Sequence, residues 1–147
     1  MCSAGGHLLQ LTALREAWHD RTRLWITDDA TDTRSLLQGE PTIFGDAPSS
    51  RSTVSLIRNT TRAWRLLRRH RPAAILTTGA AIAVPYVWLG RLFGAHVIYV
   101  ESVTRVDSTS LTLRLVRPAA TRVYVQWPEL ATRVRGALFA GTVFGAR

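Results

Sequence analysis

Apolar residues recur along this chain in two patterns, one typical of helices and one typical of short buried strands. Helical spacing over residues 7–18 predicts a first helix, and the apolar run at 23–27 predicts a strand. The same alternation continues along the chain, with a loop at 45–52. It predicts a short helix ending at residue 37, helices at about 53–70, 83–93 and 111–116, and strands at 41–44, 73–77, 96–100 and 122–125.

Strands that alternate with helices and are apolar throughout predict a parallel sheet covered by helices on both faces. We therefore expect a single α/β domain over residues 1–147, with a Rossmann-like, doubly wound fold. Only Met1 and Cys2 precede the first predicted loop, whereas a strand usually has about five or six residues. We expect that the first strand, in the middle of the sheet, is truncated from this sequence, although another segment could supply it.

A glycine loop, Ser3-Ala4-Gly5-Gly6-His7, stands before the first predicted helix. The first N–H groups of a helix have no partner inside the helix, and the helix dipole adds partial positive charge there. Glycine allows a ligand to approach the backbone, and Ser3 and His7 can donate hydrogen bonds to an oxyanion. The loop therefore predicts a phosphate site. A simple glycine turn before an amphipathic helix would have the same sequence.

Composition narrows the possible functions. The formal charge of +9 comes from 19 arginines and no lysine, and genomic base composition accounts for that choice of residue. The surplus attracts anionic lipid headgroups, nucleic acid or phosphorylated substrates. Cys2 is the only cysteine, which excludes an internal disulfide and a cysteine-based metal cluster, and we expect no metal or cofactor. No secretory signal is visible, and the apolar stretch 80–100 is interrupted too often to cross a membrane.

In open parallel sheets, ligands bind beside the carboxyl ends of the strands. The predicted strand ends carry small, hydroxylated or hydrogen-bonding residues, which we expect to gather at one edge of the sheet. They are Thr77, Thr78 and Gly79 after one strand, Glu101, Ser102 and Arg105 after the next, and Gln126 and Trp127 after the last.

Four motifs now appear in a fixed order: SAGGH at 3–7, TTGAAIAVP at 77–85, ESVTRVDSTSLT at 101–112 and VQWPEL at 125–130. The set resembles the acceptor-side subunit of the split UDP-GlcNAc transferase of asparagine-linked glycosylation, and more closely its bacterial exopolysaccharide counterparts. The resemblance implies the N-terminal half of a GT-B glycosyltransferase. It also implies a partner chain that carries the UDP-sugar site, a polyprenyl-diphosphate-linked sugar as acceptor, and a peripheral position on the cytoplasmic face of the plasma membrane.

The resemblance also implies roles for residues at the strand ends. Ser3, Gly5 and Gly6 would hold the acceptor diphosphate, and Gly79, Ser102 and Arg105 would lie against the acceptor. His7 or Glu101 would assist deprotonation of the attacking hydroxyl, and nothing in the sequence separates the two. The alternatives are a plain turn at Gly79 and an ordinary ion pair between Glu101 and Arg105.

Two further groups of residues have open interpretations. Gln126, Trp127 and Glu129 predict either a contact with the partner subunit or simply the close of the fold. The helix at 53–70 carries arginines that predict either a solvated basic face or contact with anionic headgroups, and its apolar stripe is expected to face the core. The arginines are Arg58, Arg62, Arg65 and Arg69, and the apolar stripe is Val54, Ile57, Trp64 and Leu67.

Other classes of protein fit less well. Nucleic-acid binding is disfavoured because no binding motif or aromatic platform accompanies the arginines. A dinucleotide-binding Rossmann domain would require G-x-G-x-x-G, which Ala4-Gly5-Gly6-His7 does not match, and an acidic residue after the second strand, for which Asp28 is the candidate. A non-catalytic scaffold that recruits a partner to the membrane stays open as an alternative.

Overall fold

The computed structural model describes residues 1–45 and 53–145, without the side chains of 53–55. Helices and strands alternate along the chain, as the apolar pattern predicts. The helices are α1 (Gly6–Ala13), α2 (Thr31–Leu36), α3 (Thr53–His70), α4 (Ala83–Leu92), α5 (Leu111–Val116) and α6 (Pro128–Arg133), with short 3₁₀ turns η1 (Arg15–Ala17) and η2 (Arg117–Ala119). The strands are β1 (Trp25–Asp28), β2 (Thr42–Gly45), β3 (Ala74–Thr77), β4 (His96–Val100), β5 (Arg122–Val125) and β6 (Ala137–Phe139).

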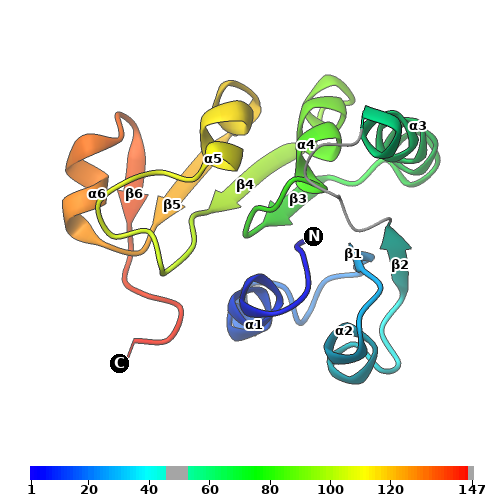
Figure 1. Ribbon diagram of the computed structural model, residues 1–147, viewed down its shortest axis with the longest axis horizontal. Coiled ribbons are helices and arrows are strands. Elements are labelled where there is room, and N and C mark those ends of the chain that lie inside the picture. Colours follow the sequence, from blue (N-terminus) through cyan, green and yellow to red (C-terminus); the bar gives the residue numbers. More distant parts are fainter. Residues whose placement is uncertain (46–52, 146–147) are drawn as a thin grey trace.

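The strands form two parallel sheets, one of β1 and β2 and one in the order β3-β4-β5-β6. Each connection between parallel partners crosses over through a helix or helical turn, as a parallel sheet requires. Helices α3, α4 and α5 lie along one side of the strands, and α1 and α2 lie on the other side (Figure 1). The expected α/β, doubly wound architecture is therefore confirmed, with the strands divided between two sheets.

The N-terminal segment lies between the two sheets. The Cys2 amide donates to the Ile26 carbonyl of β1 over 3.2 Å, and the Met1 amino group donates to the Leu76 carbonyl of β3 over 2.7 Å. Burial lowers the pKa of this amino group, because the charged form loses its hydration. Met1 and Cys2 thus hydrogen-bond to β3 and β1 at the position where we expect the first strand. The truncation of that strand stays a prediction.

Two apolar clusters hold the helices to the strands. The larger one fills the space between β3, β4 and helices α3 to α5, with Tyr86 and Tyr99 among its fully buried side chains. The smaller one joins α1 and α2 to β1 through Leu8, Leu11 and Trp25. Removal of this apolar area from water is the main force that fixes α1, and with it the glycine loop, against the sheet edge.

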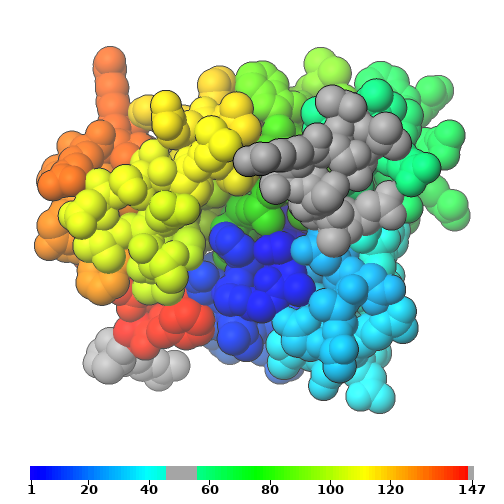
Figure 2. All heavy atoms as spheres, in the orientation of Figure 1, coloured from blue at the N-terminus to red at the C-terminus, as the bar shows by residue number. Residues whose placement is uncertain are grey.

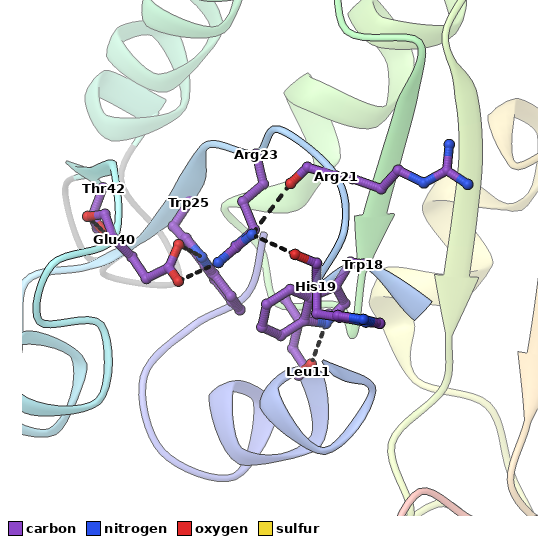
Figure 3. Close-up of polar contacts among 8 residues, drawn as sticks. All are labelled: Leu11, Trp18, His19, Arg21, Arg23, Trp25, Glu40 and Thr42. Atoms are coloured by element: carbon purple, nitrogen blue, oxygen red, sulfur yellow. Dashed lines mark hydrogen bonds and ion pairs between the residues drawn. The ribbon is translucent and has the colours of Figure 1, made fainter. Parts of the chain in front are cut away.

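A polar cluster secures the amino end of β1 (Figure 3). The Arg23 guanidinium donates to the carbonyls of His19 and Arg21, each over 3.2 Å, pairs with Glu40, and lies 4.9 Å from the centre of the Trp18 ring. Glu40 also accepts from Trp25 Nε1 over 3.3 Å. This cluster joins the turn after α1 to the start of β2.

Sequence analysis missed two elements, and one of its expectations is partly wrong. Residues 128–139 form α6 and the edge strand β6, which short, weakly periodic segments did not predict. On α3, the core-facing positions are Asn59, Ala63 and Leu67, whereas Ile57 is 64% exposed and Trp64 is 41% exposed. Leu67 is therefore buried as expected, but Ile57 and Trp64 are not, and Trp64 packs instead on Phe93, which follows α4.

Some expectations fall outside the described residues. These are the predicted loop after Gly45, over residues 46–52, and the orientation of the Val54 side chain. Within the described residues, no helix combines the length and the apolar character that a membrane crossing needs.

Candidate functional site

The glycine loop makes the tight turn that its sequence predicts. Gly5 precedes the first residue of α1 with φ 73° and ψ −136°, a conformation that residues with a Cβ rarely adopt. No side chain caps the start of α1. The loop therefore presents backbone amides at the edge of the sheet.

Two of these amides are already engaged by carboxylates. The Gly5 amide donates to Asp32 Oδ2 over 2.7 Å, and the Ala4 amide lies 3.4 Å from Asp28 Oδ2. The amides of Gly6, His7 and Leu8 have no acceptor in the described part of the chain. The expected phosphate site therefore has only three free amides, and two carboxylates lie beside it. The negative charges of these carboxylates weaken the attraction of the site for an anion.

Sequence analysis missed the part that these two aspartates play. Burial raises the pKa of Asp28, and the nearby Asp32 raises it further, whereas the Ala4 amide and His7 act in the opposite direction. The only sequence signal was an acidic residue at the end of β1. Asp28 lies 24 residues from Ala4 in the chain, so sequence analysis did not predict their contact.

His7 and Gly79 lie against each other, as the strand-end argument predicts. Thr78 Oγ1 donates to the His7 carbonyl over 2.9 Å, which ties the start of α1 to the end of β3. Gly79 has φ 106°, and a Cβ there would lie 2.6 Å from Tyr99 Oη and 3.6 Å from His7 Cε1. Glycine is therefore required at this position both for its backbone conformation and for the close approach of the Tyr99 hydroxyl.

Glu101 is fully buried, and both of its carboxylate oxygens accept hydrogen bonds. Oε1 accepts from the Ser102 amide over 2.9 Å, and Oε2 accepts from the Ser110 amide and hydroxyl over 2.8 and 3.0 Å. Ser110 caps α5, so Glu101 closes the loop 102–110 onto the end of β4. Arg105 is exposed and makes no ion pair with Glu101 in the described chain.

Tyr99 extends this bonded group toward the glycine loop. Its hydroxyl lies 3.1 Å from Ser110 Oγ, and it borders the space above Gly79. Burial and the neighbouring Glu101 both raise the pKa of Tyr99, so the phenol stays protonated. The Tyr99 hydroxyl thus links the Glu101–Ser110 group to the space above Gly79.

Gln10 is the polar centre of the site, and sequence analysis did not single it out. Its Nε2 donates to the Gly6 carbonyl over 3.1 Å and to Ser102 Oγ over 3.4 Å. Its Oε1 accepts from the Val103 amide over 2.8 Å and from Gln126 Nε2 over 2.7 Å. The available signal was a polar residue between the buried Leu8 and Leu11 of α1.

The residues predicted at the partner interface differ in exposure. Gln126 is 2% exposed, donates to the Glu101 carbonyl over 2.8 Å and accepts from the Val143 amide over 2.9 Å. Trp127 is partly buried and donates to the Val103 carbonyl over 2.6 Å, whereas Glu129 is exposed on α6. These contacts favour the alternative in which Gln126 closes the fold, and Glu129 is the member of the group that faces solvent.

The structure thus joins His7, Gly79, Glu101, Ser102 and Gln126 into one continuous group. Ser3 makes no hydrogen bond in the described chain, and Arg105 and Glu129 stand apart on the surface. Figure 2 shows the N-terminal segment, in blue, between the yellow-green segment near residue 105 and the light-blue segment near residue 30. In the described residues, no three His, Cys, Asp or Glu side chains are grouped as metal ligands.

The basic helix α3 has three exposed arginines of the predicted four. Arg58, Arg65 and Arg69 are exposed, whereas Arg62 is partly buried and donates to the Phe44 carbonyl over 3.2 Å. Exposed apolar side chains accompany them on α3 and on the neighbouring helices α4 and α5. They are Leu56, Ile57, Trp64, Trp88, Leu92, Leu111 and Leu115.

A solved structure defines the class of fold. The crystal structure of Acinetobacter baumannii MurG matches 99% of this chain with a TM-score of 0.77 and 18% identity, over 46% of the MurG chain. The fold is that of the N-terminal half of a GT-B glycosyltransferase.

The sequence comparison gives the family. Residues 46–143 match the family described as oligosaccharide biosynthesis protein Alg14 like, and the chain belongs to this family. The glycine loop precedes the matched residues, whereas Gly79, Glu101 and Gln126 lie within them.

Curated relatives carry a common name. The UDP-N-acetylglucosamine transferase subunit ALG14 of Eremothecium gossypii is 32% identical over 120 residues, 74% of this chain and 52% of the relative. The subunit of the same name from Schizosaccharomyces pombe is 38% identical over 77 residues, 49% of this chain and 37% of the relative. The chain thus spans about half, or less, of the length of these relatives.

Proposed function

We propose that this chain is the acceptor-binding subunit of a UDP-sugar glycosyltransferase, with the donor site on a partner chain. The acceptor is a polyprenyl-diphosphate-linked sugar of polysaccharide or lipid-linked oligosaccharide synthesis. The proposal draws on family membership, on relatives named as UDP-N-acetylglucosamine transferase subunits, and on the MurG-like fold. The proposal goes beyond these findings because it names the acceptor and assigns acceptor binding and donor binding to two different chains.

One observation carries the proposal: the glycine loop and the carboxyl ends of β3, β4 and β5 meet at one edge of the sheet. His7 lies against Gly79, and Gln10 joins α1 to Ser102 and Gln126. This edge is where open α/β sheets bind ligands. The free amides of Gly6, His7 and Leu8 supply donors for a diphosphate oxygen, and His7 is placed to take the hydroxyl proton of the acceptor sugar.

The contacts at the edge favour His7 over Glu101 as the proton acceptor. Every oxygen of Glu101 is occupied by a donor from the chain, and Glu101 is 0% exposed. His7 is partly exposed, and among the described residues its imidazole makes no hydrogen bond. In this proposal Glu101 fixes the loop that Ser102 and Arg105 belong to, and those two residues contact the acceptor.

Membrane association follows from the acceptor and from the helix surface. A lipid-linked sugar reaches the site only when the subunit lies on the membrane, and α3 offers four exposed arginines, three of them from the predicted group, beside exposed tryptophan and leucine side chains. Such a surface suits the headgroup region of an anionic leaflet. We place the subunit peripherally on the cytoplasmic face, with α3, α4 and α5 toward the lipid.

A second candidate, a scaffold that recruits its partner to the membrane without taking part in the reaction, has one observation in its favour. Asp28 and Asp32 already accept hydrogen bonds from the glycine-loop amides that a diphosphate would use first. Under this alternative the loop is purely structural, and His7 can be replaced without effect on transfer.

The test is sugar transfer from a panel of UDP-sugars to a short polyprenyl-diphosphate-linked GlcNAc. We expect no transfer by the purified chain alone and robust transfer when the UDP-sugar-binding partner chain is added. Transfer by the chain alone would refute the division between two chains. Full transfer by a His7→Ala variant in the complex would favour the scaffold.

Lipid contact has a separate test. We expect the Arg58→Gln, Arg65→Gln, Arg69→Gln triple variant to bind phosphatidylglycerol-containing vesicles more weakly, by about fivefold per arginine at low salt. Arg122→Gln, an exposed arginine on β5, is the matched control. Equal vesicle binding by the triple variant and the control would contradict this part of the proposal.

A further inference from the structure

Two buried glutamines, Gln10 of α1 and Gln126 at the end of β5, join segments that meet at the sheet edge. Gln10 is 3% exposed and Gln126 is 2% exposed, so the chain itself has to supply the partners of both amides. A buried amide destabilises the folded state unless its hydrogen bonds are satisfied. The bonds that these two side chains make therefore decide what they contribute.

The Gln10 amide uses its full hydrogen-bonding capacity. Its Nε2 donates to the Gly6 carbonyl over 3.1 Å and to Ser102 Oγ over 3.4 Å. Its Oε1 accepts from the Val103 amide over 2.8 Å and from Gln126 Nε2 over 2.7 Å. A backbone carbonyl can only accept and a backbone N–H can only donate, so a flipped amide would lose its bonds to both Gly6 and Val103. Only one orientation of the side chain is bonded.

Gln126 continues the same chain of bonds. Its Nε2 also donates to the Glu101 carbonyl over 2.8 Å, and its Oε1 accepts from the Val143 amide over 2.9 Å. Val143 belongs to the segment that follows β6 and leads to the C-terminus, in red in Figure 1. The two amides thus form one oriented chain of bonds from Val143 to the Gly6 carbonyl at the start of α1.

The bonds of Gln10 link two segments to which the proposed function assigns acceptor contacts. Gly6 begins the run of free amides at the start of α1, and Ser102 lies in the loop after β4. Gln10 Nε2 donates to both residues, so a single nitrogen sets how far apart the two segments lie. A ligand held by two segments binds more tightly when they are already ordered, because binding then bears no cost of ordering them.

We propose that Gln10 is a positioning residue for the acceptor, supported by Gln126. The pair holds the glycine loop and the loop after β4 at the separation that the acceptor requires. This inference rests on the proposed function. In this role neither amide contacts the reacting atoms or moves a proton. Loss of the Gln10 amide therefore weakens binding of the acceptor and leaves binding of the UDP-sugar, on the partner chain, unchanged.

The main test is Gln10→Met in the complex with the UDP-sugar-binding chain, with polyprenyl-diphosphate-linked GlcNAc as acceptor. Methionine has a similar length and forms none of the four bonds. We expect the KM for the acceptor to rise about tenfold, the scale of one lost hydrogen bond. The KM for the UDP-sugar and the shape of the pH–rate profile should stay as in the wild type. Gln126→Met, which removes only the support of Gln10, should raise the acceptor KM less.

Thr121→Val is the matched control for a purely structural loss. Thr121 Oγ1 accepts from the Val97 amide over 3.0 Å at the amino ends of β4 and β5, away from the site. The valine variant therefore also leaves a backbone N–H without its acceptor. We expect it to lower the stability of the chain, measured by urea denaturation, and to leave both KM values unchanged.

A second measurement reads the Gln10 contact without activity. We expect the Val103 amide of the full chain to exchange its hydrogen slowly in the wild type and at least about tenfold faster in Gln10→Met. Thr121→Val should leave that exchange slow. The Val106 amide, in the same loop, has no acceptor in the described chain and serves as the fast-exchanging reference.

The outcomes separate this inference from the proposed function. An acceptor KM that stays at the wild-type value in Gln10→Met, or that rises equally in Thr121→Val, would overturn the positioning role. Fast exchange of the Val103 amide in the wild type would overturn the contact itself, even if the complex transfers sugar. Absence of transfer by the wild-type complex, with the Val103 amide still protected, would instead contradict the proposed function.

Discussion

The strand β1 is only four residues long, yet its two ends are bonded in different ways. At the amino end, Arg23, Glu40 and Trp25 form ion pairs and hydrogen bonds with one another, and the Trp18 ring lies edge-on to Trp25 at 5.3 Å. At the carboxyl end, Asp28 has a buried oxygen without a partner, and the adjacent glycine loop has free amides. The amino end is held by several contacts, although Arg23 Nε has no partner in the described residues, whereas the carboxyl end combines an unpartnered buried carboxylate oxygen with free backbone amides.

We take this difference as support for the proposed binding site at the carboxyl end. A polar group that the fold leaves unsatisfied lowers the stability of the folded chain, and such groups concentrate where a ligand supplies the missing partner. The bonded cluster at the amino end supplies stability to the same strand. We therefore expect substitutions at the amino end to act on unfolding and substitutions at the carboxyl end to act on transfer.

The largest expected effect is at the amino end. Trp25 is 4% exposed, so Trp25→Ala leaves a large cavity beside Trp18 and Leu11. We expect the free energy of unfolding to fall by about 3–5 kcal/mol, as measured by urea denaturation. Trp25→Phe, which retains the ring, is the control with a smaller loss. A loss below about 1 kcal/mol for the alanine variant would show that the cluster is not a main source of stability.

His7→Gln tests the carboxyl end. The imidazole has no hydrogen-bond partner to lose in the described chain, so we expect unfolding to change by less than about 1 kcal/mol. Transfer by the complex should drop by about 100-fold or more, because general-base catalysis of this kind contributes that much. A variant that is destabilised and fully active would reverse the comparison between the two ends.

Glu101→Gln should act on stability and transfer together. The amide replaces one of two oxygens that accept from Ser102 and Ser110, so at least one buried N–H loses its acceptor. We expect a loss of about 2 kcal/mol in the free energy of unfolding and a moderate loss of transfer through the displaced loop. Glu129→Gln, on the surface of α6, is the control. A stable variant would contradict the structural role assigned to Glu101.

The smallest expected effect is a gain in stability. Burial raises the pKa of Asp28 above its unfolded value, so the wild type loses stability as pH rises from about 4 through the folded pKa. Asp28→Asn removes this loss. We expect thermal unfolding of the variant to match the wild type near pH 3 and to show a gain below about 1 kcal/mol at pH 7. A wild type that is more stable than the variant at pH 7 would mean that the carboxylate is favourably bonded.

Sequence analysis predicted the elements where the signal is local. The long helix α3 and strands β3, β4 and β5 fall close to their expected bounds, because a run of apolar residues or a 3.6-residue period needs no distant partner. Short elements with weak periodicity, α6 and β6, were missed. The side chains expected to face the core from α3 were also partly wrong. Trp64 packs on Phe93, just after α4, and the helix pattern does not contain this contact.

The site shows the same division. Grouping of His7, Gly79, Glu101 and Ser102 was predictable, because the carboxyl ends of parallel strands meet at one edge of a sheet. The hydrogen bonds that each side chain makes at this edge were not predictable. The bonds from Glu101 to Ser110, and from Gln10 to Ser102 and Gln126, were missed because they join residues far apart in the chain.

By itself, the sequence determined the α/β class, the position of the glycine loop and the chemistry available at the strand ends, because periodicity and turn residues act over a few neighbours. Only the tertiary structure decided that Asp28 and Asp32 engage the loop amides and that Gln126 and Glu101 lie inside the protein. Burial and hydrogen bonding depend on which distant segments share a volume. Packing of the whole chain is what decides whether a carboxylate is a buried, hydrogen-bonded group or an exposed charge.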